Sequence, residues 1–243
     1  MNPRGYTSDE IVQLPSGLKL ETSLSSPRLE TSSTTTDNKL AICLHPWSWL
    51  GGRMYDPVLG ELRKPLLARG YHVLRYNSRG VGKSSGWPSV TGIQEAKDLQ
   101  ELVHWALQKI PSVSSLVILG YSHGSLIASL FPLLEDTPGL KISHILLSYP
   151  LGPRSWLTAF RGGHYTTTLA NLLRDSRSHV LAIYGDNDDF TGVESYDTWA
   201  DSLRREAVDG GNLEILKIEH ANHFWRDDDA RETLLQHVQQ WVP

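Results

Sequence analysis

The stretch Leu116-Val-Ile-Leu-Gly-Tyr-Ser122-His-Gly-Ser-Leu-Ile-Ala-Ser-Leu130 decides the fold of this chain. Four consecutive apolar residues lead to Gly120, and an apolar run compatible with a helix resumes after Gly124. This pattern predicts a buried strand, a very sharp turn and a helix. The turn also matches the Gly-x-Ser-x-Gly nucleophile elbow, in which a serine on a strained turn exposes its hydroxyl above a sheet. A Cβ at either glycine would collide with the neighbouring strand and helix, which explains the glycine pair.

Strands and helices are predicted to alternate along most of the chain. Short apolar runs predict strands at Leu40–His45, Tyr71–Tyr76, Leu116–Leu119, Ile142–Ser148, Val180–Tyr184 and Leu213–Ile218. Helices are predicted at Met54–Arg69, Gly92–Ile110, after Ser122, at Val193–Val208 and at Asp227–Val242. Pro57 and Pro65 can kink or split the first of these helices. The alternation implies right-handed crossovers and an α/β fold, with a mainly parallel central sheet and helices on both faces.

The N-terminal part of the chain differs from this rhythm. Residues 9–24 are predicted to form a β-hairpin around the turn Pro15-Ser-Gly17, which adds antiparallel edge strands and brings the sheet to about eight strands. Residues 25–38 are rich in serine and threonine and are expected to be an exposed loop. Since no internal repeat or change of composition divides the chain, residues 1–243 are expected to form a single domain.

Composition narrows the function classes. The net charge of -4 and the isoelectric point near 6.2 give no electrostatic reason to expect nucleic acid or an anionic membrane as a partner. No apolar segment is long enough to span a bilayer, and no secretory signal is visible at the N-terminus. The single cysteine, Cys43, excludes an internal disulfide and is expected to be a buried, inert thiol. A soluble cytoplasmic protein is the expectation.

Chemically useful residues follow three of the predicted strands. Ser122 follows the central strand, an acidic cluster of Asp186, Asp188 and Asp189 follows Val180–Tyr184, and a histidine loop follows the last strand. Active sites in parallel sheets lie outside the carboxyl ends of the strands. Serine, acid and then histidine is the chain order of the catalytic triad on this type of sheet. These residues are therefore candidates for a nucleophile, a positioning acid and a general base.

The chain resembles the α/β-hydrolase superfamily over essentially residues 10–243. The resemblance rests on the elbow, the acid and histidine loops, and two further motifs at His45-Pro-Trp and Arg79-Gly-Val-Gly-Lys-Ser84. In the family the acid commonly follows a Gly-x-x-Asp pattern and the histidine a Gly/Ala-x-His pattern. The resemblance therefore implies Ser122, Asp188 and His223 as the catalytic residues, with His220 as the alternative base. Only a short, lid-like connection at 150–178 precedes the acid strand, which is similar to the branch with little or no lid.

An oxyanion hole requires fixed hydrogen-bond donors near the serine. The backbone N–H of His123, directly after the nucleophile and at the start of a helix, is one candidate donor. The resemblance implies that the second is the backbone N–H of Trp47, with Ser48 as the alternative. Pro46 stands where many relatives have glycine and has no N–H to donate. His45 is expected to position this loop rather than to act as a base.

Several tryptophans fall in loops on the same side of the predicted sheet. We expect Trp47, Trp156 and Trp225 to help line an apolar pocket for the acyl or alcohol part of a substrate. The alternative is that they are loop anchors that bury large areas.

A phosphate-binding loop and a metal site are not expected. The segment Gly80-Val-Gly-Lys-Ser84 resembles the end of a P-loop, but Asn77 replaces the required first glycine, and Gly86-Trp-Pro88 intervenes before any helix. No set of histidine, cysteine and acidic residues has a coordination spacing supported by its context. No cofactor is implied.

The leading hypothesis is a serine hydrolase that cleaves an ester, a thioester or a small amide in a small-molecule acyl substrate. Two alternatives remain open, because a fold does not settle a function. One is lyase, cyclase or acyl-transfer chemistry by the same triad, and the other is a non-catalytic interaction protein on a hydrolase scaffold.

Overall fold

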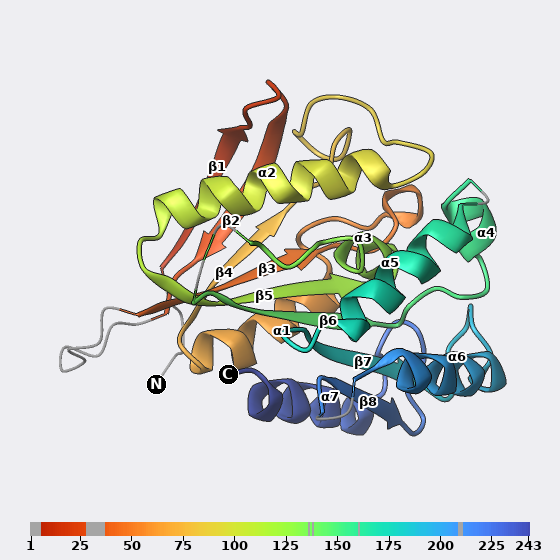
Figure 1. Ribbon diagram of the computed structural model, residues 1–243. Coiled ribbons are helices and arrows are strands. Elements are labelled where there is room, and N and C mark those ends of the chain that lie inside the picture. The colour runs from red at the N-terminus through yellow and green to blue at the C-terminus, as the bar shows by residue number, and fades with distance from the viewer. Residues whose placement is uncertain (1–5, 28–36, 136, 138, 160, 209–210) are drawn as a thin grey trace.

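A computed structural model of the chain contains one eight-stranded sheet with the order β1-β2-β4-β3-β5-β6-β7-β8 (Figure 1). The structure describes residues 6–27, 37–135, 137, 139–159, 161–208 and 211–243. The predicted loop at 25–38 falls largely on residues outside these ranges. The strands are β1 (Thr7–Gln13), β2 (Lys19–Ser25), β3 (Asn38–Leu44), β4 (Tyr71–Tyr76), β5 (Val113–Tyr121), β6 (Lys141–Leu147), β7 (His179–Gly185) and β8 (Leu213–Ile218).

The pairing confirms the predicted fold class. β1 and β2 form the expected antiparallel hairpin, and β2 joins the sheet antiparallel to β4. The pairs from β4 through β3, β5, β6 and β7 to β8 are all parallel. The carboxyl ends of these parallel strands therefore lie at one edge of the sheet, where the loops that follow β5, β7 and β8 come together.

Helices cover both faces of the sheet (Figure 1). They are α1 (Pro57–Ala68), α2 (Ile93–Lys109), α3 (His123–Ala128), α4 (Arg154–Leu157), α5 (Gly162–Arg174), α6 (Val193–Glu206), α7 (Asp228–Trp241) and the 3-10 helix η1 (Ser48–Leu50). On β3, Leu40 and Ile42 pack with α2, α3, α5 and α6, whereas Ala41 and Cys43 pack with α1 and α7. The strict alternation of these buried residues explains the continuous apolar run of a parallel strand.

Helix α1 begins three residues later than the sequence pattern predicts. Pro57 is its first residue, and the Asp56 carboxylate accepts a hydrogen bond from the Val58 N–H at 2.9 Å as the N-cap. Met54 instead donates its backbone N–H to the Asn77 side chain. Pro57 therefore starts the helix rather than kinking it, because a proline at the first position loses no intrahelical hydrogen bond.

The turn around Ser122 has the geometry of a nucleophile elbow. Ser122 adopts φ 53° and ψ −120°, a backbone conformation that L residues rarely adopt. A Cβ at Gly120 would lie 2.3 Å from the Gly124 carbonyl oxygen, and a Cβ at Gly124 would lie 2.4 Å from that of Leu44. The first contact is with the following helix and the second with the end of β3. The two glycines therefore allow the chain to reverse between strand and helix.

Replacing Gly124 with alanine is expected to destabilise the protein by about 2–3 kcal/mol, because the new methyl meets backbone that can move only with β3. The matched control is Gly60→Ala in α1, where a Cβ meets nothing within 4 Å. That substitution should be neutral or stabilise by up to about 1 kcal/mol through its helix propensity. Urea unfolding of both variants tests the prediction, and equal stabilities would contradict it.

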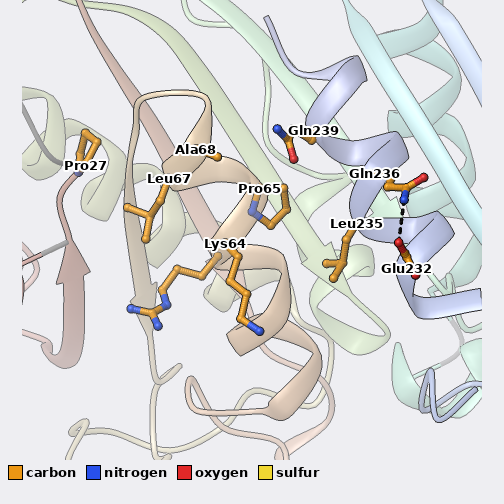
Figure 2. A pocket seen from close by; sticks show the side chains of 10 residues that line it. Pro27, Lys64, Pro65, Leu67, Ala68, Glu232, Leu235, Gln236 and Gln239 are labelled. Atoms are coloured by element: carbon orange, nitrogen blue, oxygen red, sulfur yellow. Dashed lines mark hydrogen bonds between the residues drawn. The ribbon is translucent and has the colours of Figure 1, made fainter. Parts of the chain in front are cut away.

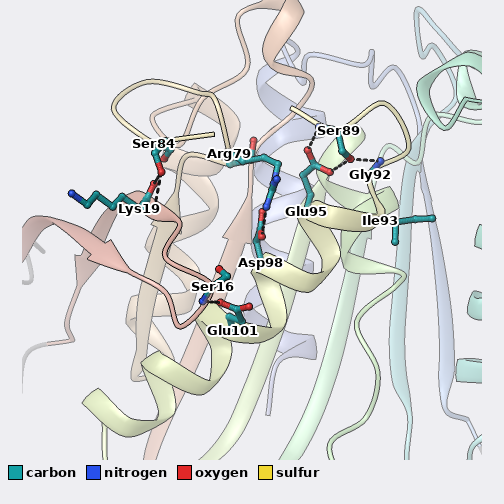
Figure 3. A network of polar contacts seen from close by, with 12 residues as sticks. Ser16, Lys19, Arg79, Ser84, Ser89, Gly92, Ile93, Glu95, Asp98 and Glu101 are labelled. Atoms are coloured by element: carbon teal, nitrogen blue, oxygen red, sulfur yellow. Dashed lines mark hydrogen bonds and ion pairs between the residues drawn. The ribbon is translucent and has the colours of Figure 1, made fainter. Parts of the chain in front are cut away.

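The loop between β4 and α2 is fixed by side-chain contacts to its neighbours (Figure 3). Arg79 donates two hydrogen bonds to the Asp98 carboxylate, at 2.6 and 2.7 Å. The Glu95 carboxylate accepts from the backbone N–H of Ser89, whose hydroxyl accepts from the Gly92 N–H at 2.9 Å. The segment at residues 80–84 is separated from the start of α2 at Ile93, so it does not present a helix N-terminus to a phosphate in the way a P-loop does.

Candidate active site

Ser122, His223 and Asp188 come together at the carboxyl ends of β5, β8 and β7. The Ser122 hydroxyl oxygen lies 2.9 Å from Nε2 of His223. The Nδ1 atom of the same ring lies 2.7 Å from Oδ2 of Asp188. Because Nδ1 faces a carboxylate, it carries the ring proton, and Nε2 is left to accept a hydrogen bond from the serine. The residues selected from the sequence thus form one hydrogen-bonded chain.

The Asp188 carboxylate is held by several donors in addition to His223. Its side chain has no exposed surface. Oδ1 accepts from the backbone N–H groups of Phe190 and Thr191, at 2.9 and 3.0 Å, and Oδ2 accepts from the Tyr196 hydroxyl at 3.2 Å. These bonds compensate the burial of the charge and fix the direction in which the carboxylate faces the imidazole.

The alternative acid and base residues lie outside this chain of hydrogen bonds. Asp189 accepts from the backbone N–H of His223 at 3.2 Å, so it supports the histidine loop. Asp186 keeps a buried oxygen, Oδ1, for which the described residues supply no partner. His220 is exposed and adopts φ 60° in the turn after β8. The structure therefore brings Asp188 and His223, rather than these neighbours, to the serine.

The loop after β3 is held by His45, which is buried with 5% of its surface exposed. Nε2 of His45 accepts from the backbone N–H of Ser78 at 3.1 Å, so Nδ1 carries the proton and donates to the Pro46 carbonyl at 2.7 Å. In a trans peptide the N–H points opposite to the C=O. The bond to Pro46 therefore turns the backbone N–H of Trp47 away from the His45 ring.

His123 is the first residue of α3, so its backbone N–H has no partner within the helix. Ser48, the alternative to Trp47, begins the 3-10 helix η1. A Cβ at Gly52 would lie 2.2 Å from the Pro46 carbonyl oxygen, so the loop passes very close to itself here. This packing adds a second restraint on the peptide that precedes Trp47.

A cavity of about 480 Å³ opens at Ser122 and His223. Its walls are mainly apolar, and the residues that line it with these two are Pro46, Trp47, Leu50, Gly51, Gly52, Asp56, Tyr121, Pro150, Pro153, Leu157, Phe190 and Phe224. Phe190 and Phe224 pack edge-on against the His223 ring, with ring centres 4.6 and 5.6 Å from it. Neither phenylalanine was predicted from the sequence, although Phe190 stands two residues after Asp188 and Phe224 directly follows His223.

Of the tryptophans expected in the pocket, Trp47 lines it. Trp225 is 1% exposed and packs in the core beside α7, where its indole N–H donates to the Ser148 hydroxyl at 3.1 Å. Trp225 is therefore a buried loop anchor, which is the alternative role considered for it, and it does not line the pocket. Trp156 belongs to α4, and its side chain lies outside the described part of the structure.

A second cavity, of about 470 Å³, lies between α1 and α7 (Figure 2). It is lined by Pro65 and Leu67 of α1 and by Leu235 and Gln236 of α7, among others, and by none of the expected site residues. None of the described residues that line it is a serine, threonine or cysteine. Among the residues that the structure describes, no group of three histidine, cysteine or acidic side chains is placed to hold a metal ion. The described helices include none with the length and apolar character needed to cross a membrane.

The fold and the chain of serine, histidine and aspartate define a serine hydrolase of the α/β-hydrolase superfamily. The family model described as X-Pro dipeptidyl-peptidase (S15 family) matches residues 16–242, so the chain belongs to this family.

The chain is also similar to individual proteins, and the solved structures among them share its fold. The chain is 38% identical over 96 residues to an uncharacterised protein of Rickettsia prowazekii, a match that spans 40% of each chain. A solved serine hydrolase without lid from Xanthomonas campestris superposes with a TM-score of 0.68 at 22% identity, covering 100% of this chain and 99% of that one. Est1E from Butyrivibrio proteoclasticus, solved with ferulic acid bound, gives a TM-score of 0.72 at 17% identity, covering 95% and 96%.

Proposed function

We propose that the protein hydrolyses an ester or thioester of a small molecule through Ser122, His223 and Asp188. The observation that carries the proposal is the 2.9 Å contact between the Ser122 hydroxyl and Nε2 of His223 at the floor of an apolar cavity. A serine hydroxyl is a weak nucleophile at neutral pH and needs a base in hydrogen-bond contact to take its proton.

In the first half of the reaction, Ser122 Oγ attacks the substrate carbonyl while its proton passes to Nε2 of His223. The carbonyl oxygen becomes negative and accepts hydrogen bonds from the backbone N–H groups of His123 and Trp47. The bond to the alcohol or thiol then breaks, and that group leaves with the proton from His223. Asp188 keeps the ring in the required tautomer and stabilises its cation. The product of this half is an acyl-enzyme.

In the second half, water attacks the acyl carbonyl and gives its proton to Nε2 of His223. The second tetrahedral intermediate collapses, Ser122 Oγ leaves and takes the proton back, and the carboxylic acid departs. Acyl transfer differs from hydrolysis in this half, and lyase chemistry needs no acyl-enzyme, so in neither case does a water oxygen enter the product. Turnover in H₂¹⁸O, followed by mass spectrometry of the released acid, separates hydrolysis from both.

Peptide cleavage is the second candidate function, because the description of the matching family names a dipeptidyl-peptidase. Helices α4, of 4 residues, and α5, of 13 residues, lie in the connection between β6 and β7, and a connection of this size leaves room for small, accessible substrates. An activated ester also presents a far better leaving group than an amide. We therefore place esters and thioesters first.

A substrate panel decides between the two candidates. We expect 4-nitrophenyl acetate and butanoate, and the matching thioesters, to be hydrolysed with kcat/KM at least about 100-fold above that for alanyl-proline 4-nitroanilide. The nitroanilide carries the X-Pro acyl group that the family description names. A higher kcat/KM for the nitroanilide would favour peptide cleavage over ester hydrolysis. No turnover of any of these substrates would contradict hydrolysis.

Removing His45 is expected to lower kcat by about 100-fold, because the Trp47 donor loses the bond that orients its peptide. His45→Asn should recover part of this loss, since its amide can still donate to the Pro46 carbonyl, whereas His45→Ala should not. The value of KM should change little in both variants. Steady-state kinetics on 4-nitrophenyl butanoate measures kcat and KM separately. An unchanged kcat in His45→Ala would show that the Trp47 N–H does not need His45 to orient it.

A further inference from the structure

The cavity beside Ser122 contains an acidic side chain that the triad does not use. Asp56 is the only acidic residue among the described residues that line this cavity. We propose that Asp56 and the surrounding aromatic rings select substrates that carry a positively charged nitrogen near the bond that is cleaved. The inference rests on the proposed function and names a substrate class for the same site.

The wall around Asp56 suits a cation. Trp47, Tyr121, Phe190 and Phe224 all line the cavity with it. The face of an aromatic ring attracts a cationic nitrogen, and a carboxylate within a group of such rings is a recurrent way to bind ammonium groups. A neutral acyl chain would fill the same apolar space but would leave the carboxylate without a counter-charge.

Asp56 has no cationic partner among the described ion pairs. Its Oδ1 accepts from the Val58 N–H at 2.9 Å, which caps α1. Burial raises the pKa of Asp56, because the ionised carboxylate has lost part of its hydration. A substrate cation beside Asp56 would supply the missing counter-charge.

Nearby charges act on Tyr121, which lines the cavity with Asp56. Burial raises the pKa of the Tyr121 phenol, and Asp56, Asp188 and Asp189 raise it further, while Arg226 acts in the opposite direction. The Arg226 guanidinium lies 4.9 Å from the centre of the Phe224 ring. One cation therefore already contacts an aromatic ring that lines this cavity.

Capping α1 does not by itself require a charge at position 56. Asparagine and serine are N-cap residues of comparable preference to aspartate, since only a hydrogen-bond acceptor is needed. Asp56→Asn therefore removes the charge and keeps the cap. Asp56→Ser does the same with a smaller side chain, should the first variant fail to fold.

The test compares pairs of esters that have the same shape and differ in charge. S-acetylthiocholine and 3,3-dimethylbutyl thioacetate place a quaternary nitrogen or a carbon on the leaving-group side. The 4-nitrophenyl esters of β-alanine and of butanoic acid place an ammonium or a methyl group on the acyl side. In at least one pair, we expect wild-type kcat/KM to favour the charged member by about 10-fold or more. In Asp56→Asn that ratio should fall to about one.

The matched control is Glu61→Gln, which removes one negative charge from the same helix. Glu61 lines the neighbouring cavity with Asp56 but not the cavity at Ser122, and its carboxylate pairs with Lys64 at 2.6 Å. In Glu61→Gln, the ratio of kcat/KM for the charged ester to kcat/KM for the neutral ester should remain that of the wild type. Equal ratios in the wild type and Asp56→Asn would overturn the proposal, as would a loss of selectivity in Glu61→Gln of the same size.

A binding measurement separates this inference from the proposed function. Phenyltrimethylammonium cannot be hydrolysed, and its titration into the wild type by calorimetry should give a Kd about 10-fold lower than in Asp56→Asn. If the neutral esters are not turned over but this difference persists, the hydrolase proposal fails and the cation site stands. No binding to the wild type, or equal binding to both proteins, would overturn the cation site.

Discussion

Ser122→Ala is expected to lower kcat for 4-nitrophenyl butanoate by about 10⁴-fold or more, because no acyl-enzyme can form without the hydroxyl. The residual rate would come from the oxyanion donors and from substrate binding alone. Ser122 is 8% exposed and its side chain contributes little to the core, so the variant should remain folded. Steady-state kinetics and thermal unfolding of the same preparation measure both effects.

Ser129→Ala is the matched control for this variant. Ser129 is a fully buried serine at the end of the same helix, α3, and its hydroxyl donates to the Leu126 carbonyl at 2.7 Å. It lies outside the cavity at Ser122, so its loss should change kcat by less than about threefold, whatever it does to stability. A comparable loss of activity in both variants would contradict a specific role for Ser122.

The second large effect expected is a loss of stability in mild acid. Burial lowers the pKa of His45 and of His144 to about 4, and burial together with repulsion by His45 lowers that of His123 to about 4. The unfolded chain protonates its histidines near pH 6.5 and so binds more protons than the folded chain between pH 6.5 and 4. Stability therefore rises with pH in this window and falls on acidification.

The expected loss of stability in acid is a large fraction of the total stability of a typical domain. Complete loss of the contribution from a fully buried histidine such as His144 costs roughly 3 kcal/mol, compared with about 5–15 kcal/mol for the stability of a typical domain. Urea unfolding at pH 7.5, 6, 5 and 4 should show a steep decline below pH 6.5. His144→Leu, far from the cavity in β6, should flatten this decline at the cost of the bond from Nε2 to the Phe131 carbonyl. A free energy of unfolding that is constant from pH 7.5 to 4 would contradict the lowered pKa values of these buried histidines.

The sequence predicted most of the fold because the strands and most of the helices have local signals of their own, whereas α4 and α5 lie in the stretch that was predicted only as a short, lid-like connection. β4 and β8 begin and end where the apolar runs do, and the elbow follows from two glycines around one serine. The start of α1 was wrong because Met54 and its neighbours have helical spacing, whereas the Asn77 side chain holds them in a turn. That contact comes from a distant part of the chain, and no local pattern records it.

The candidate site was likewise predictable where its residues follow strands, and not where their place depends on distant contacts. Ser122, Asp188 and His223 each follow a strand, so topology alone brings them to one edge of the sheet. Trp225 also follows a strand, but its loop turns back into the core beside α7, and burial of this kind is not visible in the sequence. Asp56 escaped notice because an aspartate before a proline is an ordinary helix start. Its place in the cavity depends on how α1 packs against the sheet.

The most direct test of an activated serine is labelling with a fluorophosphonate probe at pH 7.5, with the modified residue located by mass spectrometry. The hydrogen-bonded chain from Asp188 through His223 predicts modification at Ser122, no modification in Ser122→Ala and strongly slowed modification in His223→Ala. Folded wild-type protein that remains unlabelled, or that is labelled at another residue, would contradict the account of Ser122 as an accessible nucleophile.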